Sequence, residues 1–133
     1  MEAYVSSSFN QGITSIEFFH PQSNSMPSAL LQKLAQTIHE AGKHADTRVI
    51  ILQSAGDKAF CAGASFDELM AIKTEDEGLA FFSGFAKVIN AMRVCPKFII
   101  ARIHGKCVGG GVGIAAAADY TIAVNSAEIK LSE

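Results

Sequence analysis

Strand-like apolar runs that alternate with helical periodicity constrain the fold of this 133-residue chain more than any other feature. Two such runs, 4–9 and 13–19, flank a short Asn-Gln-Gly segment and predict a β-hairpin. Three more runs, 48–54, 97–105 and 119–124, are separated by stretches that predict helices. Because strands that alternate with helices form mainly parallel sheets with helices packed against them, we expect one α/β domain.

The first predicted helix follows Pro27, a residue that suits a first helical turn, and we expect Gly42 to be its C-cap. Its apolar side chains recur on one face, as an amphipathic helix requires. They are Leu30, Leu31, Leu34, Ile38 and Ala41.

Three further helical segments are predicted. Residues 65–68, Ser-Phe-Asp-Glu, match the capping box S-x-x-E and carry acidic residues in the first turn, so a helix is expected to begin at Phe66. The acidic stretch 73–78 is expected to interrupt this helix, and a longer one is expected from about Leu79 to Arg93. The alanine-rich run 112–118 predicts a short helix.

Charge and cysteine usage exclude several classes of partner. The chain has 11 basic and 13 acidic residues, a net charge of −2 and no basic run, so neither nucleic acid nor an anionic membrane surface is expected. No apolar run approaches the roughly 18 residues of a membrane span, and residues 1–10 lack a secretory signal. Cys61, Cys95 and Cys107 form no C-x-x-C pair, which favours a reducing, cytoplasmic location without disulfides.

Two loops rich in small residues, 60–64 and 106–111, each follow a predicted strand and precede a predicted helix. Functional groups collect at the carboxyl ends of parallel strands. A helix start presents unpaired backbone N–H groups and partial positive charge, which suit an anion or a developing oxyanion. Glycine leaves these amides uncovered, which would explain the triplet 109–111. Taken singly, each loop is also consistent with a tight turn or close helix packing.

A dinucleotide-binding motif is a specific alternative for the glycine loop. Residues 111–116 match G-x-G-x-x-A after a strand, and Glu133 lies 20 residues beyond Gly113, as a ribose-binding acid would. However, the loop from Ile103 to Gly111 is too long for the tight turn of that motif, and Asp119 comes too early to be the acid. This reading also leaves loop 60–64 unexplained, so we disfavour it.

Three stretches together resemble the enoyl-CoA hydratase/isomerase (crotonase) superfamily: 56–69, 95–123 and 127–133. Residues 13–34 add weaker support. The resemblance implies a fold of repeated ββα turns with mainly parallel sheets, and an acyl-CoA thioester as the substrate rather than a resident cofactor or metal. It also implies an oxyanion hole formed by the amide N–H groups of Ala64 and Gly110. The neighbouring residues that would line the substrate site are Ala62, Gly63, Ser65, Gly109, Gly111 and Gly113.

Departures from the family pattern bear on the type of reaction. Hydratases of this family carry two glutamates that hold a water molecule, and the matching positions here are Gly113 and Glu133. A single carboxylate can take a proton from one carbon and return it to another, so the pattern favours double-bond isomerisation over hydration, with Glu133 as the base. Alternatively, Gly113 only makes room for an acyl group or for helix packing, and Glu133 is an exposed acid. Ser65 stands where the family usually has aspartate.

Other side chains near the loops have structural interpretations. We expect His104 to be a hydrogen-bonding partner within the fold and Cys107 to be buried. The aromatic stripe of Phe81, Phe82 and Phe85 is expected in the core or at the lip of an acyl pocket.

Chains of this family are roughly twice as long, so we expect residues 1–133 to be an incomplete crotonase-like domain, truncated before the C-terminal helices. The full-length protein is expected to be a homo-oligomer, a trimer or hexamer, that acts on acyl-CoA. The alternative is a non-catalytic CoA-binding or assembly module.

Overall fold

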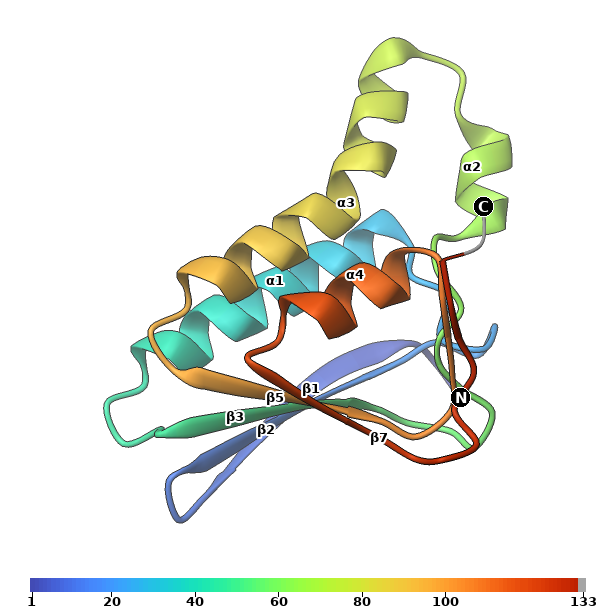
Figure 1. Ribbon diagram of the computed structural model, residues 1–133. Helices are drawn as coiled ribbons and strands as arrows, with labels where there is room; N and C mark the ends of the chain where they lie inside the picture. Colours follow the sequence, from blue (N-terminus) through green and yellow to red (C-terminus); the bar gives the residue numbers. More distant parts are fainter. Residues whose placement is uncertain (132–133) are drawn as a thin grey trace.

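A twisted five-stranded sheet with helices on one face forms the body of the protein in the computed structural model, which describes residues 1–131 (Figure 1). The strand order is β1-β2-β3-β5-β7, in which β1 is antiparallel to β2 and the remaining pairs are parallel. The strands are β1 (Tyr4–Asn10), β2 (Ile13–Phe19), β3 (Val49–Ser54), β5 (Phe98–Ile103) and β7 (Tyr120–Ala123). The predicted α/β class and mainly parallel sheet are confirmed.

A second, three-stranded sheet includes two strands, β4 (Ala59–Cys61) and β6 (Lys106–Val108), that lie within segments predicted as loops. It pairs β4, β6 and β8 (Ile129–Lys130) in the order β4-β6-β8, with both pairs parallel. Strands of two or three residues are too short to show a period-two pattern, which is why sequence periodicity missed β4 and β6. This small sheet carries both candidate loops at the carboxyl ends of neighbouring strands.

Four helices lie between these strands. They are α1 (Ser28–Lys43), α2 (Phe66–Ala71), α3 (Glu75–Val94) and α4 (Gly110–Ala117). In Figure 1, α1, α4 and the carboxyl-terminal part of α3 cover one face of the large sheet, while α2 and the start of α3 project away from it as an arm.

Three predicted boundaries were wrong. A break before Glu75 separates α2 from α3 as predicted, but α3 begins at Glu75 and not near Leu79, because the Thr74 Oγ1 accepts a hydrogen bond from the Glu77 backbone N–H at 3.1 Å. Gly42 lies inside α1, where a Cβ would come within 3.1 Å of the Cys95 Sγ and of Pro96, so it permits close packing and is not the C-cap. Helix α4 begins at Gly110, two residues before the predicted start.

The core lies between the large sheet and α1, with α3 packed across α1. Gly84 of α3 makes this crossing close, since a Cβ there would lie 2.7 Å from the Leu31 Cδ1. The predicted apolar face of α1 is confirmed, and all five of its side chains are buried. Large side chains that are almost fully buried anchor the rest of the core: Ile16, Phe18, Ile50, Leu52, Phe60, Ile99 and Ile103.

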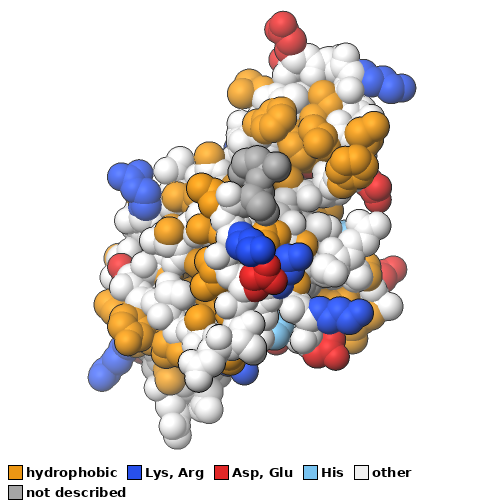
Figure 2. Space-filling view, turned by 45° about the vertical axis from the view of Figure 1, so that its right-hand side comes forward, with side chains coloured by type: hydrophobic (Ala, Val, Ile, Leu, Met, Phe, Trp, Pro, Cys, Tyr) orange, Lys and Arg blue, Asp and Glu red, His pale blue; other side chains and the backbone are white. Residues whose placement is uncertain are grey.

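The arm exposes apolar side chains that the rest of the described chain does not cover (Figure 2). Helix α2 buries none of its residues, and Phe66, Met70, Leu79 and Phe82 are each more than two-thirds exposed. Within residues 1–131, no helix has the length and apolar character needed to cross a bilayer.

Candidate functional site

The two small-residue loops meet because their strands are neighbours. Strand β4 leads into residues 62–64 and β6 leads into Gly109 and Gly110, and parallel neighbouring strands end at the same edge of a sheet. Gly63 adopts a left-handed φ of 94°. A Cβ on Gly63 would lie 3.5 Å from the Val108 carbonyl oxygen and 3.9 Å from the Gly110 nitrogen, so the two loops touch through their backbones.

A cavity of about 380 Å³, which we call the amide pocket, opens where these loops meet α3. Both residues predicted to supply oxyanion-hole amides, Ala64 and Gly110, line it. The remaining lining residues are Ala62, Gly63, Phe81, Phe82, Phe85, Val108 and Gly109. The predicted aromatic stripe therefore forms one wall, in which Phe81 is buried and Phe82 is exposed.

The backbone N–H groups of Ala64 and Gly110 have no hydrogen-bond acceptor within residues 1–131. Gly110 is the first residue of α4, so its N–H has no acceptor within the helix. Among the hydrogen bonds of residues 1–131, none uses the N–H of Ala64 or of Gly110. The start of a helix also carries a partial positive charge, and at α4 this charge lies at the Gly110 N–H. Two backbone N–H groups without an acceptor in residues 1–131 thus belong to residues that line one pocket.

The glycine triplet is required by space and by backbone conformation. Gly109 has a φ of 57° and a ψ of −130°, a conformation that residues with a Cβ rarely adopt. A Cβ on Gly110 would lie 2.7 Å from three ring carbons of Phe85, and one on Gly111 would lie 2.8 Å from the Cys61 Cβ. The triplet therefore allows α4 to start close against β4 and α3.

The other predicted substrate-site residues divide into two groups. Ala62, Gly63 and Gly109 line the amide pocket, whereas Ser65, Gly111 and Gly113 lie outside its lining. Ser65 is the N-cap of α2, and its Oγ accepts from the Glu68 N–H at 3.2 Å, as the capping box predicts. Gly113 faces α3, since a Cβ there would lie 3.0 Å from the Ile89 Cδ1.

The predicted base, Glu133, lies outside the described residues. The chain leads toward the glycine loop before that point, because β8 pairs with β6 and the Gly109 N–H donates to the Lys130 carbonyl at 3.3 Å.

Two buried cysteines, Cys61 and Cys107, lie beside this site. Cys61 and Cys107 are neighbours in the β4–β6 register, and burial raises their thiol pKa values to about 12 and about 11. Such thiols stay neutral near pH 7 and are poor nucleophiles. Cys107 is buried as expected. In the part of the chain that the structure describes, no group of three or more His, Cys, Asp or Glu side chains could hold a metal ion.

Sequence reasoning missed the side chains that hold the first loop in place. The Glu68 Oε1 of α2 accepts from both the N–H and the Oγ of Ser28 at the start of α1, at 3.0 and 2.8 Å. Asn24 is also buried, and its carbonyl oxygen accepts from the Ala62 N–H at 3.3 Å. His104 differs from its expected role, since neither of its ring nitrogens finds a hydrogen-bond partner within residues 1–131.

Both the sequence and the fold of this chain are similar to those of known proteins. The family model described as enoyl-CoA hydratase/isomerase matches residues 8–133. The chain is also similar to solved structures, among them an enoyl-CoA hydratase from Bacillus anthracis, with a TM-score of 0.85, 32% identity, and coverage of 92% of this chain and 48% of that one.

Three curated relatives are named for reactions of different types. The chain is 31% identical to a (7aS)-7a-methyl-1,5-dioxo-2,3,5,6,7,7a-hexahydro-1H-indene-carboxyl-CoA hydrolase of Rhodococcus jostii, and the match covers 97% of this chain and 50% of that protein. It is 34% identical to a methylglutaconyl-CoA hydratase of Rattus norvegicus (83% and 35% covered). It is 30% identical to a Delta(3,5)-Delta(2,4)-dienoyl-CoA isomerase of Mus musculus (83% and 36% covered). The chain thus spans half or less of the length of each.

Proposed function

The chain belongs to the enoyl-CoA hydratase/isomerase (crotonase) family, and from this premise we propose that the protein binds acyl-CoA thioesters in the amide pocket and stabilises an enolate there. The observation that carries the proposal is that Ala64 and Gly110, which come from two separate loops, line one cavity. Within residues 1–131, neither of their backbone N–H groups donates a hydrogen bond. The three relatives described above are all named for CoA compounds, which supports a thioester as the substrate class.

Catalysis would rest on charge that develops on the thioester oxygen. When a base removes a proton from the α- or γ-carbon, the electron pair moves toward the carbonyl and the oxygen becomes an enolate oxygen. Two amide donors in a fixed position stabilise that charge more strongly than the neutral carbonyl. In comparable sites each such donor contributes about 2.7–4 kcal/mol to the stability of the transition state.

We propose Glu133 as the base and isomerisation as the favoured reaction. Glu133 would take a proton from one carbon of a 3-enoyl-CoA and return it to another, which moves the double bond into conjugation with the thioester and consumes no co-reactant. By resemblance, position 113 corresponds to the first of the two glutamates of the family's hydratases. Gly113 has no carboxylate that could hold a water molecule there. Gly113 instead faces Ile89 of α3.

The test uses the protein expressed from the complete reading frame. Wild-type protein is expected to convert 3-enoyl-CoA to 2-enoyl-CoA faster than it hydrates 2-enoyl-CoA, and Glu133→Gln is expected to abolish the conversion. Glu128→Gln is the matched control, because Glu128 is an exposed glutamate whose ion pair is with Lys130. Turnover that survives in Glu133→Gln would exclude Glu133 as the base, and CoA binding without any turnover would favour the non-catalytic module.

A homo-oligomer is also part of the proposal. The exposed apolar side chains of the arm and of β7, where every residue is exposed, support further burial in the whole protein. Sedimentation analysis of the complete protein is expected to give a trimer or hexamer, and a monomer would refute this part.

A further inference from the structure

Asn24 occupies an unusual position in the loop between β2 and α1. Its side chain is almost fully buried, and both Asn24 and the preceding Ser23 have left-handed φ angles of 58° and 57°. Asparagine tolerates this conformation better than most residues with a Cβ. The Asn24 N–H donates to the His20 carbonyl at 3.0 Å, which closes the turn. The local sequence thus fixes the direction in which the Asn24 side chain leaves the loop.

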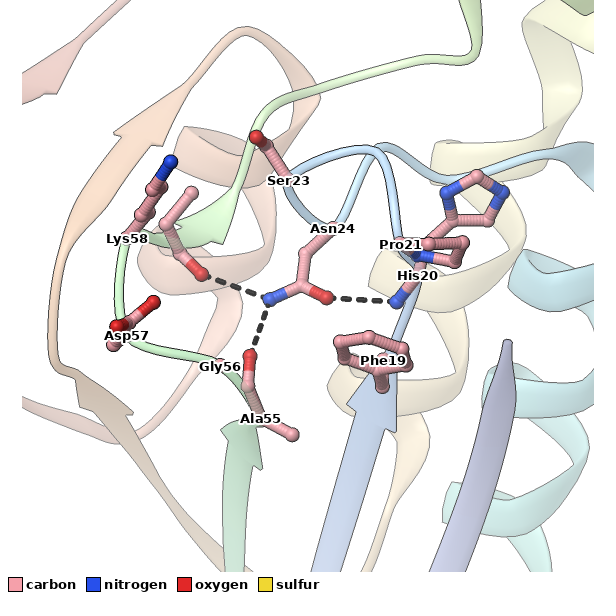
Figure 3. Close-up of a pocket in the computed structure, with 10 residues that line it drawn as sticks. Phe19, His20, Pro21, Ser23, Asn24, Ala55, Gly56, Asp57 and Lys58 are labelled. Carbon is pink, nitrogen blue, oxygen red and sulfur yellow. Dashed lines mark hydrogen bonds between the residues drawn. The ribbon is translucent and has the colours of Figure 1, made fainter. Parts of the chain in front are cut away.

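The side-chain amide of Asn24 joins three backbone groups (Figure 3). Its Oδ1 accepts from the His20 N–H at 2.7 Å. Its Nδ2 donates to the carbonyl oxygens of Ala55 and Ala59 at 2.7 and 2.8 Å. Both Nδ2 hydrogens and the oxygen are therefore used, and they link the end of β2 to both ends of the loop between β3 and β4.

The backbone of residues 24–26 in turn supports the first amide loop. The Ala62 N–H donates to the Asn24 carbonyl at 3.3 Å, and the Met26 N–H donates to the Gly63 carbonyl at 2.8 Å. Met26 and Ala64 form a parallel bridge, and Met26 is almost fully buried. Residues 62–64 thus lie along residues 24–26 like a short added strand, which sets where the Ala64 N–H points.

Asn24 does not reach the amide pocket itself. It lines a separate cavity with His20, Ala55, Lys58 and Ala59, and it is absent from the lining that contains Ala64 and Gly110. Any effect of Asn24 on a ligand of the amide pocket must therefore pass through the backbone of residues 62–64.

We propose that Asn24 is a positioning residue for the oxyanion hole: it holds residues 24–26, and through them residues 62–64, so that the Ala64 amide points at the oxygen that Gly110 also binds. This inference rests on the proposed function. Misplacement of a catalytic group by about 1 Å can reduce turnover on the order of a hundredfold. Loss of the Asn24 contacts is therefore expected to lower kcat, because the oxyanion hole binds the charged oxygen of the transition state more strongly than the neutral carbonyl of the bound substrate.

Two substitutions separate the roles of the Asn24 amide. Asn24→Asp is isosteric and can still accept from His20, but it turns an oxygen toward the carbonyls of Ala55 and Ala59. Asn24→Gly keeps the left-handed backbone and removes the amide altogether, so it serves where the aspartate variant fails to fold. Asn90→Asp is the matched control, since Asn90 is exposed on α3.

The first readout is steady-state kinetics on an enoyl-CoA with the protein from the complete reading frame. Asn24→Gly is expected to lower kcat by about ten- to a hundredfold with KM changed less than about threefold, while Asn90→Asp leaves both unchanged. A kcat equal to that of the wild type in Asn24→Gly would overturn the assignment.

The second readout is amide hydrogen exchange, which does not depend on activity. Selective loss of protection at Ala62 and Met26 in Asn24→Gly, with β3 and β5 still protected, supports the positioning role. Unchanged protection at these two amides, or an equal loss throughout the sheet, overturns it. A wild-type protein without turnover would refute the proposed function alone, because the exchange experiment would still decide what Asn24 holds in place.

Discussion

Gly110→Ala is expected to destabilise the protein because the added methyl group has no room beside Phe85. The new Cβ would lie 2.7 Å from three carbons of the ring, whereas carbon atoms pack at about 3.5–4.0 Å, so the ring must move by about 1 Å. Overpacking of this kind costs about 1–3 kcal/mol. Alanine regains only part of about 1 kcal/mol of helix propensity at the first position of a helix, which leaves a net loss of about 1–2 kcal/mol.

Gly113→Ala provides a control within the same helix. Its Cβ would meet only the side chain of Ile89, at 3.0 Å from the Cδ1 and 4.0 Å from the Cγ1, and the Cδ1 is the end of a flexible side chain. Gly113 lies inside α4, where replacement of glycine by alanine gains about 0.5–1 kcal/mol. The free energy of unfolding is therefore expected to stay unchanged or to rise slightly in this variant.

Urea unfolding followed by circular dichroism measures both variants. The alanine at position 110 should lower the free energy of unfolding by at least about 1 kcal/mol relative to the alanine at position 113. Phe85→Leu in the Gly110→Ala background should recover part of the loss, with a coupling energy of about 1 kcal/mol in the double-mutant cycle. Equal stabilities for the two alanine variants, or no coupling to Phe85, would refute the packing argument.

Three further predictions follow from the same contacts. Gly110→Pro is compatible with the first position of a helix but removes the backbone N–H. In the complete protein it should reduce kcat by about 10²–10³-fold beyond the effect of Gly110→Ala, while CoA still binds. Equal kcat values in the two variants would contradict a role for that N–H. Glu68→Ala should lower the free energy of unfolding by about 1–3 kcal/mol because Ser28 loses its acceptor, whereas Glu68→Gln retains an acceptor oxygen and should lose less; identical urea midpoints would count against the contact. Burial raises the pKa of the Cys61 thiol from 9.0 to about 12. Because the unfolded chain loses this proton at a lower pH than the folded chain, the free energy of unfolding should fall as the pH rises above 9. Cys61→Ala should make the free energy of unfolding less dependent on pH in this range, and an unchanged dependence would argue against the raised pKa.

The arrangement of strands and helices was predictable because apolar residues recur periodically over long segments of the sequence. The strand runs and the apolar face of α1 recur over enough residues to be recognised. Strands β4 and β6, of three residues each, offer no such period. The start of α3 carried a usable signal, since Thr74 and Glu77 have capping-box spacing, but the acidic run around them suggested an interruption.

The candidate site was predictable where it depends on backbone exposure and not where it depends on distant contacts. Small residues at the ends of two strands indicated open amides, and Ala64 and Gly110 do line one cavity. The residues that hold the first loop are different. Asn24 reaches carbonyl groups 31 and 35 positions away, and Glu68 reaches Ser28 across 40 positions. Partners so far apart in the sequence leave no recognisable spacing pattern, so only the folded structure reveals such contacts.

The most direct test of the central claim is a crystal structure of the complete protein bound to a saturated acyl-CoA thioester, which cannot be isomerised. We expect the thioester oxygen to lie within about 3.2 Å of both the Ala64 and the Gly110 nitrogen. An oxygen bound by neither amide, or by only one of them, would contradict the proposed site.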